Sequence, residues 1–195
     1  MTAACRVCSE VKLWFHKPSG VPLTKAQTFE RLSLDFKGPL PSSSKNKYIV
    51  MVIDEFSGFP FAFPRANVER KTVIMCLTQL FSHFGMCSCI HSDNAASFTS
   101  RAFIDILHKF GISVTRTSVY NPRDNGQTER YNGIVWSAVT SALKLHNPPV
   151  AQWETVLLDM LHSVPALLCT STNATPRERM FAFSRRSSIG LSVPT

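Results

Sequence analysis

The sequence predicts an α/β fold in which a five-stranded mixed sheet is flanked by helices. Three strand-like segments come first along the chain, and two later strands then alternate with helices. This order is typical of a mixed sheet with helices packed on it. The length of 195 residues and an apolar content of 44% suit one domain with a substantial core. We therefore expect a functional site at the carboxyl ends of the parallel strands.

The first three strands follow from local patterns of apolar side chains. Residues 29–36 alternate apolar and polar side chains, as in a strand with one buried face, and a loop rich in Gly, Pro and Ser follows. Residues 48–54 form a nearly continuous apolar run, which is typical of a buried strand. The turn Ser57-Gly58 then predicts that residues 59–64 return as its hairpin partner.

The middle of the chain predicts two helices around a fourth strand. Asn67 is the expected N-cap of a helix whose apolar spacing continues to Gly85. Residues 87–90 predict a short strand. Thr99 or Ser100 is expected to cap a second helix, which ends at the next glycine.

The last third predicts one more strand and two helices. Residues 112–116 suit a fifth strand, residues 120–126 suit a loop, and a long helix is expected from Gln127 to the proline pair at 148. A last helix is expected at 150–168. The residues expected to be buried in the long helix are Tyr131, Val135, Ala138, Val139 and Ala142. An irregular basic tail should follow, containing Arg177, Arg179, Arg185 and Arg186.

The composition is that of a basic protein without a membrane segment. Lys and Arg number 21 against 13 acidic residues, and the resulting net charge of +8 favours polyanionic partners such as nucleic acid. No apolar run approaches the roughly 18 residues of a membrane span, and the first residues lack the apolar core of a secretion signal. The six cysteines are expected to be reduced thiols. We therefore expect a location in the nucleus and cytoplasm.

Three acidic residues lie at the ends of predicted elements. Asp35 ends the first strand, Asp93 follows the fourth, and Glu129 lies in the first turn of the long helix. Carboxylates that converge repel and desolvate one another, so such a cluster is stable mainly when cations neutralise it. Mg²⁺ suits hard oxygen ligands and keeps positions for water and phosphate. Two such ions about 4 Å apart would suit in-line phosphoryl displacement by water or a DNA 3′-hydroxyl.

Each of these acids also has a structural alternative. Asp35 could bind a loop amide, Asp93 could support the following turn, and Glu129 could complement a helix N-terminus. The metal-site interpretation therefore depends on all three acids together. Structural roles are assigned to the remaining acids of similar placement, namely Asp54, Glu55, Asp105 and Asp124.

The motifs around the three acids resemble the catalytic core of integrases from gypsy-type retrotransposons. The resemblance covers about residues 29–180, and the 35 residues between Asp93 and Glu129 are typical of that family. The motifs are Leu34-Asp35-Phe36 with Gly38-Pro39-Leu40, His91-Ser92-Asp93-Asn94 with Phe98-Thr99-Ser100, and Tyr120-Asn121-Pro122 with Asn125-Gly126-Gln127-Thr128-Glu129-Arg130 and Asn132.

The resemblance implies a ribonuclease H-like fold and DNA 3′-end processing and strand transfer. The chain would then be a catalytic core at residues 29–180, truncated from a retrotransposon polyprotein. DNA is the implied partner, together with further copies of the chain in a homodimer or higher oligomer. The implied ligands of two Mg²⁺ or Mn²⁺ ions are Asp35, Asp93 and Glu129. The expected DNA contacts are Asn125, Gln127 and Arg130.

Residues 1–28 are interpreted as the remnant of a zinc-binding domain followed by a linker. Cys5 and Cys8 resemble the end of the family's zinc-binding domain, whose histidine pair is expected upstream of this chain. A structural zinc site needs four ligands, so these thiols form an incomplete site even with a contribution from His16. Residues 181–195 are expected to be an irregular basic tail. Without a complete zinc domain, we do not expect the chain alone to integrate two DNA ends together.

Two positions depart from the family pattern. Ala95 stands where the family usually has glycine, and alanine would cost about 1 kcal/mol if the backbone needs positive φ there. Gly133 stands where a basic residue is frequent, and it weakens the helix by up to about 1 kcal/mol. These departures leave open an inactive, host-adopted remnant that binds DNA or protein partners. In a third interpretation the chain is a ribonuclease H-like nuclease that acts by hydrolysis alone. The Cys5-x-x-Cys8 pair argues against this interpretation.

Overall fold

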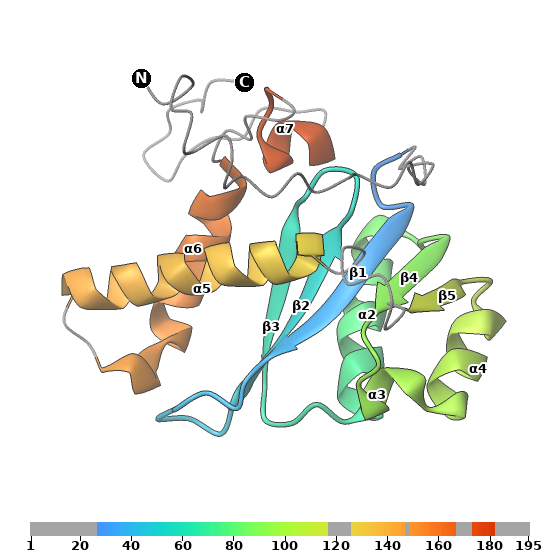
Figure 1. The fold of residues 1–195 in the computed structure, drawn as a ribbon, viewed down its shortest axis with the longest axis horizontal. Helices are drawn as coiled ribbons and strands as arrows, with labels where there is room; N and C mark the ends of the chain where they lie inside the picture. Colours follow the sequence, from blue (N-terminus) through green and yellow to red (C-terminus); the bar gives the residue numbers. More distant parts are fainter. Residues whose placement is uncertain (1–26, 117–125, 147–148, 167–172, 182–195) are drawn as a thin grey trace, which may run out of the picture.

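The computed structural model describes residues 27–116, 126–146, 149–166 and 173–181 (Figure 1). Its centre is a five-stranded sheet in the order β3-β2-β1-β4-β5. Strand β1 pairs antiparallel with β2 and parallel with β4, β2 pairs antiparallel with β3, and β4 pairs parallel with β5. The predicted five-stranded mixed sheet is therefore confirmed. The strands are β1 (Arg31–Lys37), β2 (Tyr48–Asp54), β3 (Pro60–Arg65), β4 (Cys89–Ser92) and β5 (Ser113–Arg116).

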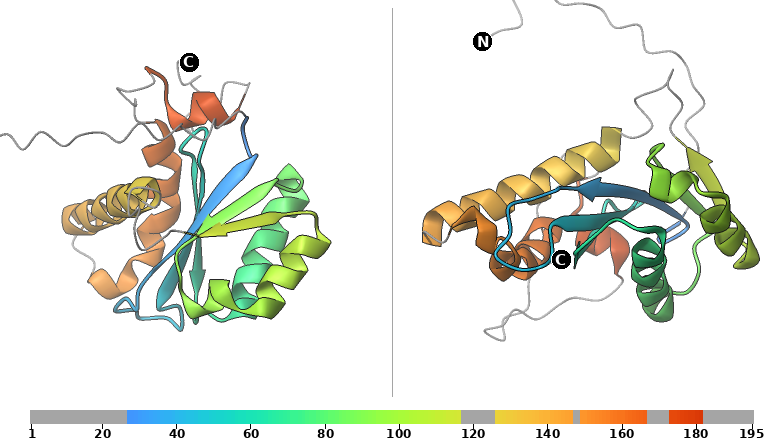
Figure 2. Two further views of the ribbon diagram at one scale, coloured as in Figure 1. Left: turned by 45° about the vertical axis from the view of Figure 1, so that its right-hand side comes forward. Right: turned by 90° about the horizontal axis from the view of Figure 1, so that it is seen from below.

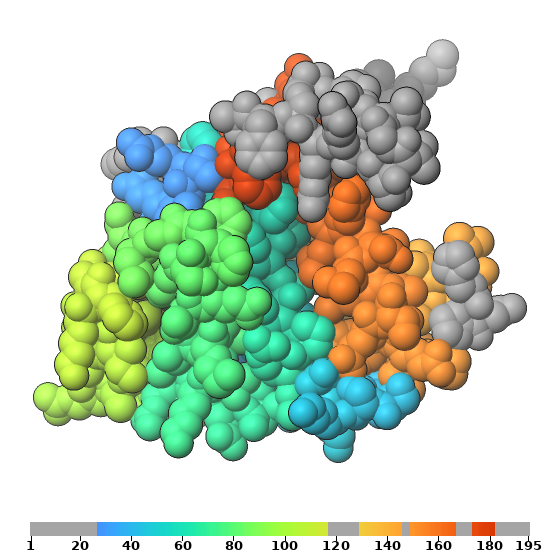
Figure 3. Space-filling model, turned by 180° about the vertical axis from the view of Figure 1, so that it is seen from behind, coloured from blue at the N-terminus to red at the C-terminus, as the bar shows by residue number. Residues whose placement is uncertain are grey.

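Helices cover the two faces of the sheet in different ways (Figure 2). On one face α2 (Arg70–Phe84), α3 (Ala96–Thr99) and α4 (Arg101–Lys109) enclose a core with β1, β2 and β4. On the other face α5 (Gly126–His146) and α6 (Glu154–Ser163) form a second core with β2 and the partly buried Ala62 of β3. Seen from behind, α2 and α4 make one side of the surface and α6 the other (Figure 3).

Strand β1 alternates between these two faces, as its sequence predicted. Leu32 and Leu34 are fully buried in the core that contains α2 and α4. Ser33 and Asp35 alternate with them and therefore point to the face on which α5 lies. The alternation thus separates an apolar face from a face that carries polar groups in the centre of the sheet.

Most predicted elements exist, and several boundaries are corrected. Helix α2 ends at Gly85, where φ is 81°, as expected. Its N-cap is Glu69 and not Asn67, whose side chain instead accepts bonds from the Glu69 amide and the Thr72 hydroxyl. Ser100 does occupy the N-cap position of α4, but its side chain makes no capping hydrogen bond.

The fourth strand begins and ends two residues later than predicted. Strand β4 covers Cys89–Ser92, because it pairs with β1 from Arg31 to Leu34 and this pairing includes the polar His91 and Ser92. The short helix α3 after Asp93 was not predicted. The last helix is also shorter than 150–168, because 3-10 turns at Val150–Gln152 and Val164–Ala166 flank α6.

The prediction that the chain is irregular around Arg177 and Arg179 is wrong in part. Residues Pro176–Met180 form α7, which begins with a capping box in which Thr175 and Glu178 exchange hydrogen bonds. The Arg179 carbonyl accepts a bond from the Thr28 hydroxyl at 3.1 Å. Helix α7 is therefore tied to the start of the described domain; Arg185 and Arg186 lie outside the described residues.

Helix α5 buries part of the apolar stripe that its spacing predicted. Val135 and Val139 are buried as expected, and the other three expected residues, Tyr131, Ala138 and Ala142, are half-buried. Leu143 is also buried, although it was not predicted. No helix in the described ranges is long and apolar enough to cross a bilayer. The cysteines described, Cys76, Cys87 and Cys89, carry free thiols.

Replacing Gly133 with alanine should stabilise the chain. Gly133 is exposed within α5, and a Cβ added there would meet no atom within 4 Å. Because alanine has the higher helix propensity, the free energy of unfolding should rise by about 0.8 kcal/mol. Urea denaturation would measure this change, and a loss of stability would show that the position has a contact that favours glycine.

Candidate active site

Asp35 lies near the middle of the central strand and faces α5. Its Oδ1 accepts a hydrogen bond from the Phe36 amide at 2.7 Å, and its Oδ2 accepts one from the Asn132 side chain. Burial raises the pKa of Asp35 above its ordinary value, and the charges of Asp93 and Glu129 raise it further, while the two hydrogen bonds lower it. The carboxyl group is therefore in a site where negative charge is already concentrated.

Asp93 is brought beside Asp35 by the parallel pairing of β4 with β1. Leu34 pairs with Ser92, and an aspartate follows each of them, Asp35 within β1 and Asp93 directly after the end of β4. Asp93 Oδ1 accepts a bond from the Ala95 amide at 2.9 Å, which is the turn-supporting contact expected for a structural role. Phe98 of α3 stacks on Phe36 with ring centroids 4.5 Å apart, and this contact fixes the segment after Asp93 against β1.

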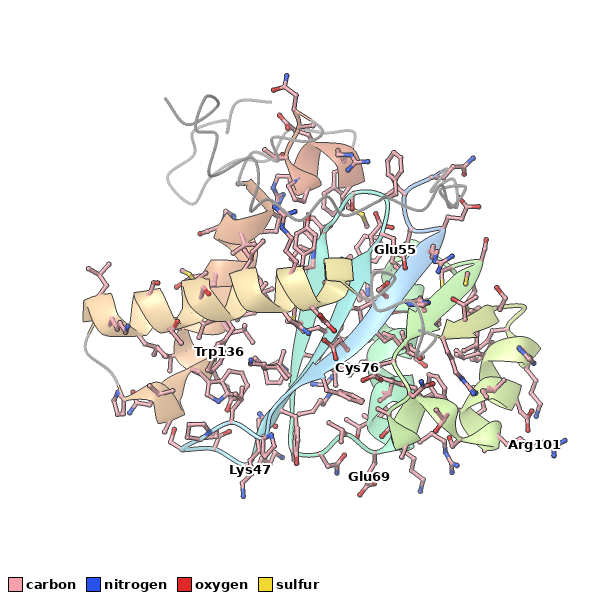
Figure 4. All side chains as sticks on the ribbon, viewed as in Figure 1. Lys47, Glu55, Glu69, Cys76, Arg101 and Trp136 are labelled. Carbon is pink, nitrogen blue, oxygen red and sulfur yellow. The ribbon has the colours of Figure 1, made fainter. Side chains whose placement is uncertain are left out.

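Glu129 reaches the same region from the first turn of α5. Its side chain is exposed, and its charge acts on Asp35. Helix α5 contacts both β1 and β2, and the Lys37 Nζ of β1 lies 5.8 Å from the ring centre of Trp136 of α5, which is labelled in Figure 4. The charges of Asp93 and Glu129 therefore both act on Asp35, although 57 residues separate Asp35 from Asp93 and 35 separate Asp93 from Glu129.

Asn132 is part of this site although the sequence assigned it no chemical role. It lies three residues after Glu129 on the same side of α5, it is buried, and its amide group donates to Asp35. The amide nitrogen must face the carboxylate, since an amide oxygen would repel it. Asn132 Oδ1 is a buried acceptor with no hydrogen-bond partner among the described residues. The spacing Glu129-x-x-Asn132 was the signal that could have identified it.

The carboxylates of Asp35, Asp93 and Glu129 are suitable ligands for a hard divalent cation, although they are not arranged as a complete set of metal ligands. In the described ranges, no three His, Cys, Asp or Glu side chains are arranged to hold a metal ion as they stand. The charges of Asp93 and Glu129 nonetheless act on Asp35, so a cation among them would relieve their mutual repulsion. Carboxylate oxygens are the ligands that Mg²⁺ prefers, and both Asp93 and Glu129 are at least partly accessible.

The expected nucleic-acid contacts are only partly described. Arg130 is exposed near the start of α5, next to Glu129. Asn125 lies outside the described residues, and Gln127 is described only as part of the helical backbone. Cys5, Cys8 and His16 also lie outside the described residues.

Residues 25–122, half of the chain, match the family described as the integrase core domain. The chain belongs to the integrase core domain family. This integrase core is 28% identical over 160 residues to the Pro-Pol polyprotein of simian foamy virus type 3, covering 82% of the chain. It is 32% identical over 148 residues to the Tf2-3 polyprotein of Schizosaccharomyces pombe, covering 73% of the chain. The chain spans 14% and 11% of those polyproteins, respectively.

Solved structures show that this integrase core has the ribonuclease H-like fold of retroviral integrase catalytic cores. The catalytic core domain of HTLV-2 integrase in complex with magnesium superposes with a TM-score of 0.64 at 19% identity, covering 80% of this chain and 99% of that one. A chain of the simian T-cell lymphotropic virus intasome in complex with a PP2A regulatory subunit gives a TM-score of 0.70 at 22% identity, covering 90% and 63%.

The Ala95 departure carries no backbone strain in this integrase core. Ala95 has φ −58° and ψ 142°, which is ordinary extended backbone for an alanine. The condition for the expected cost of about 1 kcal/mol, a positive φ, is therefore not met. Glycine is not needed at this position for the turn that carries Asp93.

A polar network of the integrase core lies on the same sheet face as Asp35, toward the start of β1. Glu55 is buried, accepts a bond from the Ser33 hydroxyl at 2.5 Å and lies 3.0 Å from the Arg31 Nε. His91 Nδ1 lies 3.0 Å from the Thr115 hydroxyl on the neighbouring strands. Figure 4 shows Glu55 at the end of the sheet where β1 begins. These contacts link β1 to the end of β2 and support the structural role predicted for Glu55.

Replacing Arg31 with methionine should destabilise the integrase core. The substitution keeps the apolar stem of the side chain but leaves the buried Glu55 charge without this ion-pair partner, at a cost of about 2 kcal/mol. Denaturant unfolding would measure the loss. Adding Glu55→Gln should recover most of it, because the neutral amide no longer needs the cation, whereas additive losses would contradict the assigned pair.

Proposed function

We propose that this chain is the catalytic core of a gypsy-type retrotransposon integrase that processes and joins DNA 3′ ends. The observation that carries the proposal is that Asp93 follows the strand paired with the strand of Asp35, and that the charges of Asp93 and Glu129 raise the pKa of Asp35, within a chain of the integrase core domain family. Three mutually repelling carboxylates cost stability unless the site uses their charge. Their environment supports a site for metal-assisted phosphoryl transfer.

In this proposal Asp35, Asp93 and Glu129 would hold two Mg²⁺ or Mn²⁺ ions. When bound, these ions would activate the attacking oxygen and stabilise the leaving oxygen of an in-line displacement. Asn132 would keep the Asp35 carboxylate in one orientation through its amide hydrogen bond. The Phe36 amide would also orient the Asp35 carboxylate, and the Ala95 amide would orient that of Asp93, through the hydrogen bonds that they donate. The magnesium bound to the HTLV-2 core of the same fold supports this choice of ion.

DNA and further copies of the chain are the proposed partners. The net charge of +8 favours the phosphate backbone, and Asn125, Gln127 and Arg130 are the proposed contacts near the acids. Assembly into a dimer or higher oligomer is supported by the dimeric and trimeric forms of the HTLV-2 core and by the intasome of the related simian virus. A DNA substrate implies action in the nucleus after synthesis in the cytoplasm.

The test is a strand-transfer assay on a branched DNA that mimics an integration product. The purified chain should resolve this DNA in Mn²⁺ or Mg²⁺, and chelation by EDTA should stop the reaction. Asp35→Asn, Asp93→Asn and Glu129→Gln should each abolish resolution, since they preserve size and remove metal-binding charge.

The same assay distinguishes the alternative function. A chain that has a folded far-UV spectrum and binds the branched DNA, but resolves none of it in either metal, would be an inactive remnant that acts by binding. Resolution that survives substitution of any of the three acids would overturn the assigned site.

A further inference from the structure

The β2–β3 hairpin makes an unusually close approach to α5 at Gly58. A Cβ placed on Gly58 would lie 2.7 Å from the Tyr131 Cζ and closer still to the Tyr131 hydroxyl oxygen. Both distances are under 3.0 Å, a separation that real Cβ atoms essentially never show. Gly58 also has φ +76°, so the turn needs glycine for its backbone as well. The tyrosine of α5 is therefore seated directly over a backbone position that carries no side chain.

The turn of the β2–β3 hairpin at Gly58 is fixed by hydrogen bonds to the buried Asp54. Its carboxylate accepts bonds from the Phe29 amide at 2.9 Å and from the Ser57 amide and hydroxyl at 2.8 and 2.5 Å. The Gly58 amide donates to the Asp54 carbonyl at 2.8 Å. Because several bonds fix the turn, a side chain added at Gly58 would displace Tyr131 more readily than the hairpin.

Tyr131 lies between the two residues of α5 that reach the acid site. Glu129 is two residues before it, and Asn132, which donates to Asp35, directly follows it. The rest of α5 is held through Val135 and Val139, which are buried in the core with Ile49 and Met51. The contact of Tyr131 with the hairpin therefore lies at the start of α5, beside the bond of Asn132 to Asp35.

We propose that Tyr131, seated over Gly58, is a positioning residue that sets where the first turn of α5, and with it Glu129, stands against Asp35. This inference rests on the proposed function, since it gives Glu129 and Asp35 a shared metal. It assigns the tight turn at Gly58 a role in the geometry of the acid site. A misplacement of about 1 Å in such a site is enough to lower a rate by about a hundredfold.

The test is a double-mutant cycle between Gly58→Ala and Tyr131→Ala, read by Mn²⁺ binding in calorimetry without DNA and by resolution of the branched DNA. Gly58→Ala should weaken Mn²⁺ binding by about tenfold and slow resolution by about a hundredfold. Tyr131→Ala should weaken binding less, and adding it to Gly58→Ala should recover much of the loss, because the clash is gone. Tyr131→Phe should recover an intermediate amount, since it removes only the nearest atom.

Gly111→Ala is the matched control. Gly111 has φ +74°, close to that of Gly58, but a Cβ there would meet no atom within 4 Å. The two alanine variants therefore share the backbone strain and differ in the contact with Tyr131. Gly111→Ala should lose similar stability and keep the Mn²⁺ affinity of the unmodified chain.

The outcomes separate the two proposals. If the unmodified chain binds no Mn²⁺, the proposed function fails, and this inference fails with it. If the unmodified chain binds Mn²⁺ but Gly58→Ala behaves like Gly111→Ala, or if the losses in the cycle are additive, the positioning role alone is overturned. Non-additive losses confined to the Gly58–Tyr131 pair support it.

Discussion

Asp35→Asn is expected to slow strand transfer by about a thousandfold while it stabilises the metal-free chain. The two effects have one cause. Burial, together with the charges of Asp93 and Glu129, raises the pKa of Asp35 above its ordinary value, so the ionised carboxyl is less favourable in the folded chain than in the unfolded one. Asparagine removes that charge, and with it a ligand that the proposed metal site needs.

The pH dependence follows from the sign of this shift. Above the raised pKa of Asp35, the charged group destabilises the folded state, and the neutral variant avoids the whole penalty. As the pH falls through the raised pKa toward the ordinary value, the native carboxyl takes up its proton before the unfolded one does. The advantage of Asp35→Asn in melting temperature should therefore be largest at neutral pH and shrink toward acid.

Thermal unfolding of both proteins from about pH 4 to about pH 8 would measure this difference. Mn²⁺ should raise the melting temperature of the unmodified chain and leave that of the variant nearly unchanged. Asp105→Asn is the control, because Asp105 is an exposed acid on α4 away from the site. Equal stabilisation of all three proteins by Mn²⁺ would contradict a metal site at Asp35.

Sequence patterns predicted the strands best where burial alone determines them. Strand β2 has the predicted bounds, because six of its seven residues are buried and its apolar run has clear ends. Strand β4 was misplaced because His91 and Ser92 are polar, and their burial depends on pairing with β1. Helix α3 has only four residues, which is too short for a helical period to be visible.

The candidate site was predictable as a set of acids but not as a set of contacts. The flanking motifs and spacing predict that Asp35, Asp93 and Glu129 form one site, and the charges of Asp93 and Glu129 do raise the pKa of Asp35. Their joint role as metal ligands stays a prediction. The ion pair of Arg31 with Glu55 was not visible, because it depends on the register that pairs Leu32 with Asp54. Ala95 was expected to be strained only if its φ were positive, and a backbone angle cannot be read from one residue type.

Asn132→Asp is expected to lower the stability of the chain at neutral pH by about 3 kcal/mol. The substitution preserves shape but replaces the amide that donates to Asp35 with a second carboxylate in direct contact with it. Asn132 is buried, so water screens the new charge poorly. The two carboxyl groups should share one proton, and the stability of the variant should therefore rise steeply as the pH falls.

Urea denaturation across the acidic and neutral range would measure this behaviour beside two further variants. Asn132→Leu removes the hydrogen bond without adding charge and should cost about 1 kcal/mol with little added pH dependence. Asn67→Asp makes the same chemical change at an exposed asparagine whose side-chain oxygen already accepts hydrogen bonds, and it should be nearly neutral. Equal, pH-independent losses for Asn132→Asp and Asn132→Leu would show that Asn132 does not face the Asp35 carboxylate. A steep pH dependence confined to Asn132→Asp, and reduced by Mn²⁺, would place Asn132 and the proposed cation in one electrostatic site.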